Sequence, residues 1–570
     1  MGAQAGPLAQ QFRVVTLVAA LAVGSLFSGW ADQARGSRGA VATVNALATD
    51  AGMAALKRGG NAVDAAIAAA LTLGLADGHN SGIGGGCFML IRLPDGSVVA
   101  LDGRETAPAA ATREMFVRNG HADPGLSQTG ALAVGVPGAL AAYAAAAERF
   151  GKLPFADHLR AAAEVAERGF PIDAHYAARL KATAPDLRLF PSSRAIFLHS
   201  DGSPLREGEI LKQLDLAQSY RAIADQGIRW FYEGPFAKAT AQWMGTNNGL
   251  VTKTDFSSYQ VKWREPIRTT YRGYEIIGFP PPSSGGVHVA QILNLLEGYD
   301  LRSYELNSPK YIRLVTECMK LAFADRAHWL GDPDFTDVPR GLLSKTYANE
   351  LARNLGGERA LPVNSFHTPP EAATDRFGKH TTHFSAADGG GTWVACTATI
   401  NTSFGSKVVV PGTGVLLNNQ MDDFSSQAGA PNVFGLIGGD ANAVAPGKRP
   451  LSSMSPTLVL KQGQPILALG AAGGPTIISQ VLLTLVQMLD FDLTSGEALD
   501  QPRFHHQWRP DVLRIERGLA GAIRRDLRRR GYRIEVERVI GSTQIVAKTP
   551  NGRTFVAASD PRGGGKAGAW

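Results

Sequence analysis

The chain has 570 residues, of which 44% are hydrophobic and 19% are charged. This balance is typical of a globular protein with a large core and excludes an intrinsically disordered chain. Lys and Arg number 57 against 50 Asp and Glu, and this mild net charge of +7 does not predict nucleic acid as a partner. The three cysteines, Cys87, Cys318 and Cys396, lack the spacing of a zinc site or a disulfide framework, so each is predicted to be a small buried hydrophobe.

An apolar run near the N-terminus, residues 14–27, follows Arg13 and leads into small residues before Ala31 and Ala34. This is the pattern of a secretory signal peptide. The run is shorter than the roughly 20 apolar residues that a membrane-spanning helix needs, and no cysteine follows it for a lipid anchor. We therefore predict a signal peptide over residues 1–31, cut between 31 and 34, a periplasmic or secreted protein, and no membrane span once the signal is removed. A buried first helix of the fold is the alternative.

The rest of the chain alternates between batches of helical and strand periodicity. Residues 59–75 are apolar on nearly every face and predict a buried helix with Asn61 as its N-cap. Residues 89–92 and 98–102, joined by Pro94-Asp95-Gly96, predict a β-hairpin. Further helices are predicted at 138–150, 156–168, 308–329 and 475–489, and further strands at 392–401, 407–410, 457–460, 466–469, 543–548 and 554–558.

Three conspicuous features favour a structural role over a functional one. Residues 81–87 are rich in glycine, but Cys87 replaces the third glycine of the dinucleotide-binding fingerprint and no Gly-Lys-Ser/Thr follows. His505 and His506 are adjacent, so their side chains diverge on a strand or a helix and form a poor metal chelate. The arginines within residues 524–530 are predicted to lie on a solvated helix face rather than in an anion site.

A polar stretch at residues 355–380, with several glycines and prolines, predicts a linker or a processing site. It leads to His380-Thr381-Thr382, just before the strand pattern at 392–401. Taken alone, this threonine pair favours the opening of a strand, because threonine has a high β propensity. The motifs that follow it in the sequence change that interpretation. Four motifs follow within about a hundred residues, at Thr397–Asn401, Leu417–Phe424, Lys448–Pro456 and Gly473-Gly474.

Together these motifs closely resemble those of the γ-glutamyltranspeptidase family. The resemblance covers essentially the whole mature chain, with further motifs in the family's order at residues 59–66, 102–105, 501–506 and 559–562. It implies an N-terminal-nucleophile hydrolase of the α+β class, a four-layer αββα sandwich with two sheets between helical layers. It also implies an inactive precursor that cuts itself between His380 and Thr381 into a large chain, 32–380, and a small chain, 381–570, which together form a heterodimer and the sandwich. No cofactor or metal is implied.

By this match Thr381 is the nucleophile. A threonine hydroxyl is a weak nucleophile that needs a nearby base, and the freed α-amine of Thr381 can be that base. An α-amine has a pKa of roughly 7.7–8, which suits it to accept a proton near neutrality. The resemblance assigns Thr399 to orient the Thr381 hydroxyl and the backbone N–H groups of Gly473 and Gly474 to hold the oxyanion.

The substrate class follows from the same resemblance. A γ-glutamyl group carries a free α-carboxylate and a free α-ammonium, and both need partners when they lose water. The assigned residues are Arg104 with Ser452 and Ser453 on the carboxylate side, and Asn401, Gln420 and Asp423 on the ammonium side. The implied donors are glutathione and other γ-glutamyl compounds, and the implied acceptors are water, amino acids or dipeptides. Singly, each residue has a structural explanation, such as an ion pair for Arg104 or a turn for Ser452-Ser453.

One position departs from the family pattern. Residues 425–439 match the loop that covers the substrate in many bacterial members, but Phe434 stands where the family often has tyrosine. The loop favours a γ-glutamyl enzyme over the related cephalosporin or glutaryl acylases, which are the alternative enzymes. A catalytically silent exported binding protein is the alternative from another class, and it would require a damaged centre.

Overall fold

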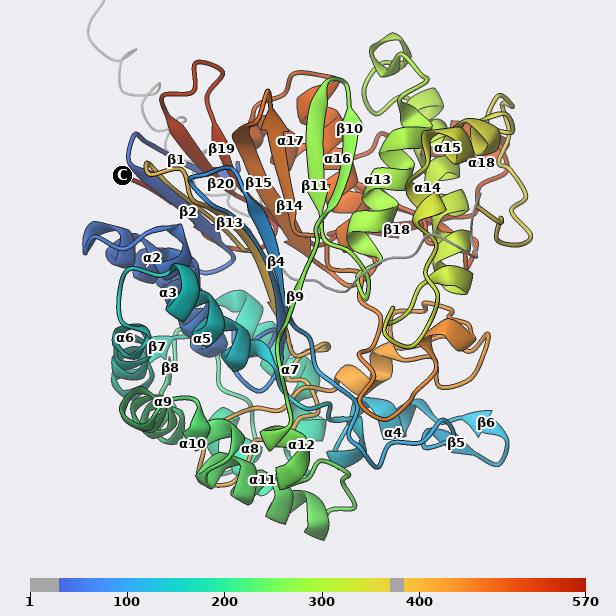
Figure 1. Ribbon diagram of the computed structural model, residues 1–570. Coiled ribbons are helices and arrows are strands. Elements are labelled where there is room, and N and C mark those ends of the chain that lie inside the picture. Colours follow the sequence, from blue (N-terminus) through green and yellow to red (C-terminus); the bar gives the residue numbers. More distant parts are fainter. Residues whose placement is uncertain (1–29, 370–383) are drawn as a thin grey trace, which may run out of the picture. The chain divides into compact units, whose positions relative to one another are not determined.

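Two seven-stranded antiparallel sheets form the centre of the computed structural model, which describes residues 30–369 and 384–570 (Figure 1). The first sheet consists, in order, of β1 (Asp32–Gly36), β20 (Phe555–Ser559), β19 (Ser542–Lys548), β15 (Gln464–Ala472), β14 (Thr457–Lys461), β11 (Tyr274–Gly278) and β10 (Ile267–Tyr271). The second consists of β21 (Lys566–Ala569), β2 (Gly39–Thr43), β12 (Ser385–Asp388), β13 (Trp393–Thr399), β3 (Gly86–Arg92), β4 (Val98–Gly103) and β9 (Lys262–Arg264). All of these strands belong to one unit, Ala31–Trp570.

Shorter sheets and helices complete this unit. The short sheets pair β16 (Phe504–His505), β17 (Leu513–Glu516) and β18 (Ile534–Glu537), then β5 (Val117–Arg118) with β6 (His121–Ala122), and β7 (Phe170–Pro171) with β8 (Ile210–Leu211). The helices are α2 (Ala46–Lys57), α3 (Ala62–Ala76), α4 (Pro124–Gln128), α5 (Ala139–Phe150), α6 (Phe155–Arg168), α7 (Ala174–Leu187), α8 (Pro191–Phe197), α9 (Leu214–Gln226), α10 (Arg229–Tyr232), α11 (Pro235–Thr246), α12 (Lys253–Ser257), α13 (Gly285–Leu296), α14 (Pro309–Trp329), α15 (Lys345–Ala352), α16 (Thr476–Leu489), α17 (Ser495–Asp500) and α18 (Gly521–Arg529).

Strand β3 shows why the two sheets face each other. Every residue of β3 is buried, and its side chains alternate between two hydrophobic clusters. Phe88 and Leu90 belong to the cluster that also holds the first sheet, whereas Met89 and Ile91 belong to the cluster of the helices around α3. Successive side chains of a strand point to opposite faces, so β3 is covered by the other sheet on one face and by helices on the other. Phe88 stacks on Phe279, which follows β11, with ring centroids 5.1 Å apart.

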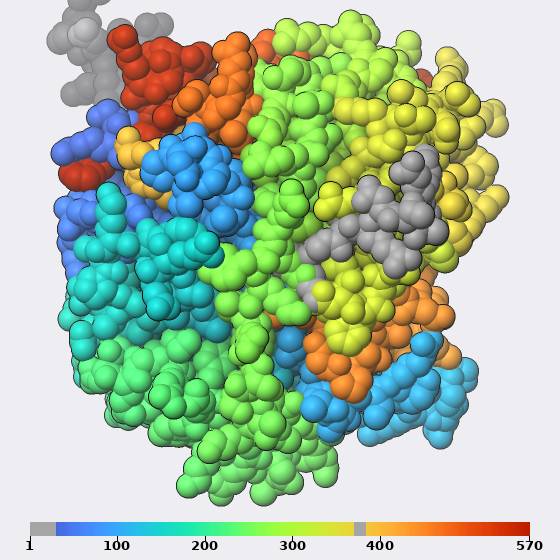
Figure 2. Space-filling view, in the orientation of Figure 1, coloured from blue at the N-terminus to red at the C-terminus, as the bar shows by residue number. Residues whose placement is uncertain are grey.

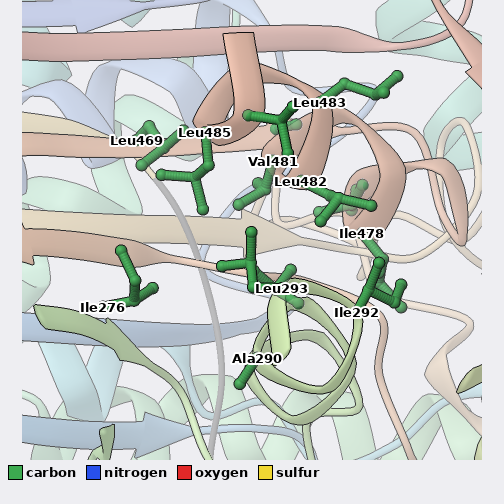
Figure 3. Close-up of a cluster of buried hydrophobic side chains, with 14 of the residues drawn as sticks. Ile276, Ala290, Ile292, Leu293, Leu469, Ile478, Val481, Leu482, Leu483 and Leu485 are labelled. Carbon is green, nitrogen blue, oxygen red and sulfur yellow. The ribbon is translucent and has the colours of Figure 1, made fainter. Parts of the chain in front are cut away.

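Helices pack on the outer faces of the sheets. α2, α3 and α5 contact strands of the second sheet, and α13 and α16 contact strands of the first (Figure 1). Figure 3 shows side chains of the latter region, where Leu293 of α13, Val481 of α16, Ile276 of β11 and Leu469 of β15 belong to one buried cluster. α16 is important for function, because it begins directly after the paired glycines 473 and 474 at the end of β15.

The strong periodicities predict the elements correctly. The helix expected at 59–75 is α3, which begins with a capping box between Asn61 and Asp64, and the hairpin is β3 and β4. The helices expected at 138–150, 156–168, 308–329 and 475–489 are α5, α6, α14 and α16, and the strands expected at 392–401, 457–460, 466–469, 543–548 and 554–558 are β13, β14, β15, β19 and β20. The strand expected at 407–410 is wrong. Gly405 and Lys407 have φ values of +47° and +69°, which break an extended strand and leave Val409 in one isolated bridge with Leu416.

The glycine run, the adjacent histidines and the cysteines have the structural roles predicted for them. A Cβ on Gly85 would lie 2.0 Å from the Thr399 carbonyl oxygen, so the glycine run lets two strands approach closely. His505 and His506 are buried and hydrogen-bonded, His505 to Ser479 and His506 to Asp511, and burial lowers the pKa of His505 to about 3. All three cysteines are free and buried.

Two predictions fall partly on residues that the structure does not describe. Of the predicted signal peptide, residues 1–29 lie outside the described residues. No helix in the described part of the chain is long and apolar enough to cross a membrane. The described part of the polar stretch, 355–369, forms neither helix nor strand.

Candidate active site

Residues that the motifs single out converge on one pocket, although they come from distant parts of the chain. The pocket is lined by Thr399, Asn401, Gln420, Asp423, Phe434, Ser452, Ser453, Gly473 and Gly474, together with Asn80, Thr397 and Arg326. Arg104 does not line the pocket, but it is hydrogen-bonded to Asp423, which does. His380 and Thr381 lie outside the described residues, so their predicted roles stay predictions.

Thr399 is the last residue of β13, and its Oγ1 accepts a hydrogen bond from the Asn401 backbone N–H at 2.8 Å. Asn401 has a φ of +79°, which turns the chain out of the strand. Its Nδ2 donates to the Asn419 carbonyl oxygen at 3.0 Å, so the turn is tied to the next motif. Thr397 shares a strand face with Thr399, because side chains two residues apart point the same way. This wall therefore presents two hydroxyls and one amide to the pocket.

A carboxylate occupies the next corner of the pocket. Asp423 Oδ2 accepts hydrogen bonds from Gln420 Nε2 at 2.7 Å and from Arg104 Nη2 at 2.5 Å. Arg104 is fully buried, and its Nε donates to the Pro450 carbonyl oxygen at 3.1 Å. Gln420 and Arg104 together orient Asp423, which is only 11% exposed at its side chain. This corner can bind a cation such as an ammonium group.

The peptide between Ser452 and Ser453 is held from behind by Ser284. The Ser452 carbonyl oxygen accepts hydrogen bonds from the backbone N–H and the hydroxyl of Ser284, at 2.8 and 2.7 Å. In a trans peptide the C=O and the following N–H point in opposite directions. The Ser453 N–H therefore points away from Ser284, and both Ser452 and Ser453 line the pocket. A carboxylate is a suitable acceptor for such an N–H and for the two hydroxyls.

Arg326 of α14 adds a positive charge to this serine corner. Its Nε donates to Ser284 Oγ at 2.9 Å and its Nη2 to Ser453 Oγ at 3.2 Å. Burial lowers the pKa of Arg326 to about 10, and the charge of Asp423 opposes that shift, so the guanidinium is charged at pH 7. Because Arg326 only donates hydrogen bonds, Ser453 must accept from it and keeps its own hydroxyl proton for a ligand.

Glu105 is a second carboxylate near Arg104. It is fully buried, and its Oε2 lies 3.6 Å from Arg104 Nη1. Among the described residues, neither carboxylate oxygen of Glu105 accepts a hydrogen bond. Burial raises the pKa of Glu105 to about 8, although the charge of Arg104 opposes the rise. One guanidinium thus lies between two carboxylates, of which only Asp423 lines the pocket.

A glycine turn closes the side of the pocket where α16 begins. Gly473 and Gly474 have φ values of +139° and +60°, which other residues rarely adopt. A Cβ on Gly474 would lie 2.8 Å from the Phe434 ring, so the loop at 425–439 covers this turn closely. Val433 N–H holds the loop by donating to Asp422 Oδ2 at 3.0 Å. Backbone N–H groups at the start of a helix favour negative charge, which suits this turn to an anion.

The segments that flank the covering loop share a small core with the chain that follows Arg104. Ala107, Ala111 and Phe116 pack on Met421, Phe424 and Val444. Figure 2 shows the light-blue and orange segments that contain these residues side by side at the surface. The chain after Arg104 is therefore held to the segment that contains Asp423 by packing as well as by the Arg104–Asp423 bond.

A family model of γ-glutamyltranspeptidase matches residues 48–570, which is most of the chain. The chain belongs to the γ-glutamyltranspeptidase family. It is accordingly an enzyme of the γ-glutamyl hydrolase and transferase class, and the resemblance seen in its motifs is confirmed.

Individual relatives of this chain include both hydrolases and acylases. The glutathione hydrolase proenzyme of Escherichia coli (strain K12) is 44% identical over 531 residues, 93% of this chain and 91% of that protein. The acylase ACY 1 proenzyme of Pseudomonas sp. (strain SE83) is 39% identical over 534 residues, 92% of each chain. A crystal structure of cephalosporin acylase from Bacillus halodurans matches with a TM-score of 0.84 and 30% identity, covering 96% of this chain and 98% of that one. The predicted α+β class is thereby confirmed.

Three residues of this site were not expected from the sequence. Arg326 lies inside the long helix α14, where an arginine carries no local signal, and its partner Ser453 is 127 residues away. Glu105 stands beside Arg104 in a motif but carries no assigned role. Ser284 belongs to the run Pro280–Gly286, which contains three prolines, two serines and two glycines. Such a run signals a tight turn, and this is the one feature that could have drawn attention to Ser284.

Proposed function

We propose that this chain is a self-processing enzyme that cleaves the γ-glutamyl bond of glutathione and related compounds through a γ-glutamyl ester of Thr381. The observation that carries the proposal is the convergence, in one pocket, of three chemically distinct corners. They are the carboxylate corner at Asp423, the hydroxyl and cation corner at Ser453 and Arg326, and the glycine turn at Gly473. A zwitterionic head group beside a scissile amide requires this combination.

Maturation would cut the precursor between His380 and Thr381 and leave a large and a small chain in one heterodimer. The strand order supports this. In the second sheet, β2 and β3 of the large chain flank β12 and β13 of the small chain, and in the first sheet β11 of the large chain adjoins β14 of the small one. The two chains would therefore share both sheets of a four-layer sandwich and stay together after the cut. Export by the predicted signal peptide would place the enzyme in the periplasm or outside the cell.

Binding of the glutamyl group would use the two charged corners. The α-ammonium would contact Asp423, with Gln420 and Asn401 beside it. The α-carboxylate would accept hydrogen bonds from Ser452 and Ser453, within the positive field of Arg326 and Arg104. The serine corner is buried and the Asp423 side chain is only 11% exposed, so each charge of the ligand would exchange water for a fixed partner.

Catalysis would proceed in two half-reactions. The Thr381 Oγ1 attacks the γ-carbonyl carbon while its proton passes to the α-amine of Thr381. The carbonyl oxygen becomes an oxyanion held by the N–H groups of Gly473 and Gly474. The C–N bond then breaks, and the leaving nitrogen takes the proton from the α-amine. Water or an acceptor amine next attacks the ester and loses a proton to the same amine. The bond from the acyl carbon to Thr381 Oγ1 then breaks, Oγ1 takes the proton back from the amine, and glutamate or a γ-glutamyl peptide is released.

The test combines maturation and turnover. Thr381→Ala should remain one chain on a denaturing gel and show no glutathione cleavage, because neither the hydroxyl nor the freed amine is present. The wild type should give two chains, with a fragment that begins Thr-Thr-His-Phe-Ser by mass spectrometry. Thr549→Ala, in the turn between β19 and β20, is the matched control and should be cut and active. An active, uncut Thr381→Ala variant would contradict the proposal.

A glutaryl acylase is the second candidate, because the chain is similar to acylases in sequence and in structure. A glutaryl group lacks the α-ammonium, so it has no use for the carboxylate of Asp423. The two functions can be distinguished by comparing turnover of two chromogenic anilides, one γ-glutamyl and one glutaryl. We expect turnover of the γ-glutamyl anilide to dominate, and Asp423→Asn should reduce it while sparing any glutaryl turnover. Preferential turnover of the glutaryl anilide would favour the acylase.

A further inference from the structure

A buried glutamine lies directly behind the glycine turn. Gln480, on the second turn of α16, donates from Nε2 to the Ala472 carbonyl oxygen at 3.0 Å and to Thr476 Oγ1 at 3.1 Å. Its Oε1 accepts from Arg503 Nη1 and from Thr543 Oγ1, both at 3.2 Å. Because an arginine can only donate, the amide can lie only with its oxygen toward Arg503 and its nitrogen toward Ala472.

Arg503 is itself held in place by Asp560. Its Nη2 bonds to Asp560 Oδ2, and its Nη1 also donates to the Ile540 carbonyl oxygen at 3.1 Å. Asp560 Oδ2 further accepts from the Thr543 backbone N–H at 2.9 Å. Arg503 and Asp560 belong to the motifs at 501–506 and 559–562, to which no role has been assigned so far. A buried ion pair contributes little to stability by itself, so its position beside Gln480 needs another explanation.

The direction of the Ala472–Gly473 peptide supplies that explanation. Its carbonyl oxygen points at Gln480, and in a trans peptide the N–H points the opposite way. The Gly473 N–H therefore points away from Gln480, and both Gly473 and Gly474 line the pocket. The next peptide is held in the same manner, because the Gly473 carbonyl oxygen accepts from Thr476 Oγ1 at 2.8 Å. Both N–H groups of the turn are thus aimed by bonds to their carbonyl partners.

We propose that Gln480, fixed by Arg503 and Asp560, is a positioning residue that aims the oxyanion-binding N–H groups of Gly473 and Gly474. The inference rests on the proposed function, since it needs a tetrahedral oxyanion at this turn. Gln480 touches neither substrate nor the reacting atoms. Its contribution lies in the transition state, where the oxyanion forms, and not in the binding of the glutamyl head group.

Gln480→Met tests this role, because methionine keeps the length of the side chain and removes all four hydrogen bonds. On mature enzyme, with a γ-glutamyl anilide, kcat should fall by about ten- to hundredfold while KM changes less than about twofold. A boronic acid analogue of the glutamyl group, which forms a tetrahedral adduct with the nucleophile, should lose affinity in parallel with kcat. Inhibition by glutamate, which is planar at the reacting carbon, should be unchanged.

The matched control is Gln487→Met, a buried glutamine seven residues farther along α16 and about 10 Å from Gln480 along the axis. It should keep the kcat of the wild type. If Gln480→Met does not mature, Thr543→Val removes one of the two donors that fix Oε1, and kcat should fall by about three- to tenfold at constant KM.

The outcomes separate the two proposals. A mature Gln480→Met or Thr543→Val enzyme with the kcat and boronate affinity of the wild type would overturn the role of Gln480 and leave the proposed function standing. A rise in KM together with weaker glutamate binding would also overturn it, because the defect would then lie in head-group binding. A wild-type enzyme without γ-glutamyl turnover would instead overturn the proposed function itself.

Discussion

Arg104 and Asp423 are bonded to each other at 2.5 Å, although the family resemblance assigns them to opposite charges of the glutamyl head group. Arg104 therefore orients Asp423 and compensates its charge, in addition to any contact with the α-carboxylate. Asp423 is the member of the pair that lines the pocket. The two ends of the head-group site are thus one electrostatic unit.

The first prediction follows from this pairing. Arg104→Lys should lower kcat/KM by about ten- to hundredfold, because an ammonium cannot bond Asp423 and the Pro450 carbonyl oxygen as the guanidinium does. Maturation should be intact, and the effects of Arg104→Lys and Asp423→Asn should be non-additive. Arg302→Lys, in an exposed ion pair with Asp492, is the control and should leave the kinetics unchanged. Additive losses would show that the residues act independently.

The second prediction concerns Arg326. Arg326→Lys should raise KM by about tenfold with a much smaller change in kcat, because the bonds to Ser284 and Ser453 serve ground-state binding of the α-carboxylate. Ser284→Ala should act in the same direction but more weakly. Arg160→Lys, on the exposed face of α6, should be neutral. Steady-state kinetics with a γ-glutamyl anilide measures all three, and an unchanged KM in Arg326→Lys would refute this role.

Glu105 leads to a prediction about stability and pH. Burial raises its folded-state pKa from 4.5 to about 8, so the folded state holds this proton more tightly than the unfolded chain. The stabilisation is present below pH 4.5 and is lost as the pH rises to about 8. The melting temperature of the wild type minus that of Glu105→Gln should therefore decrease as the pH rises from 4.5 to about 8. Above that pH the difference should stay constant. Glu148→Gln, exposed on α5, should show no such trend, and a flat difference for Glu105→Gln would contradict the prediction.

How far the sequence predicts this protein depends on the range of the interactions. The helix α3 and the hairpin of β3 and β4 are found correctly because their signals are local, an Asn61-capped apolar run for α3 and a Pro-Asp-Gly turn between two apolar runs for the hairpin. Residues 407–410 have the composition of a strand, but positive φ values at Gly405 and Lys407 override it. Arg326 and Gln480 show no local signal, since their partners, Ser453 and Arg503, are brought near only by the fold.

The covering loop provides a fourth prediction. Phe434→Ala removes the ring that covers Gly474. The loss of one aromatic contact should raise KM several-fold. Phe434→Tyr keeps the ring and should stay close to the wild type. Leu189→Ala removes an exposed apolar side chain just after α7, outside the pocket lining, and serves as the control. Equal KM values for Phe434→Ala and the wild type would show that the loop does not retain substrate.

The central claim is a covalent γ-glutamyl ester on Thr381, and acid quenching during turnover of a γ-glutamyl substrate tests it most directly. Mass spectrometry of the small chain should show the mass of one added glutamyl group, located on the peptide that begins at Thr381. Glycylglycine should lower the fraction of small chain that carries this adduct and should yield γ-glutamyl-glycylglycine, because water and the amine compete for one ester. Steady turnover with the adduct on another residue, or with no adduct when breakdown of the intermediate limits the rate, would contradict the account.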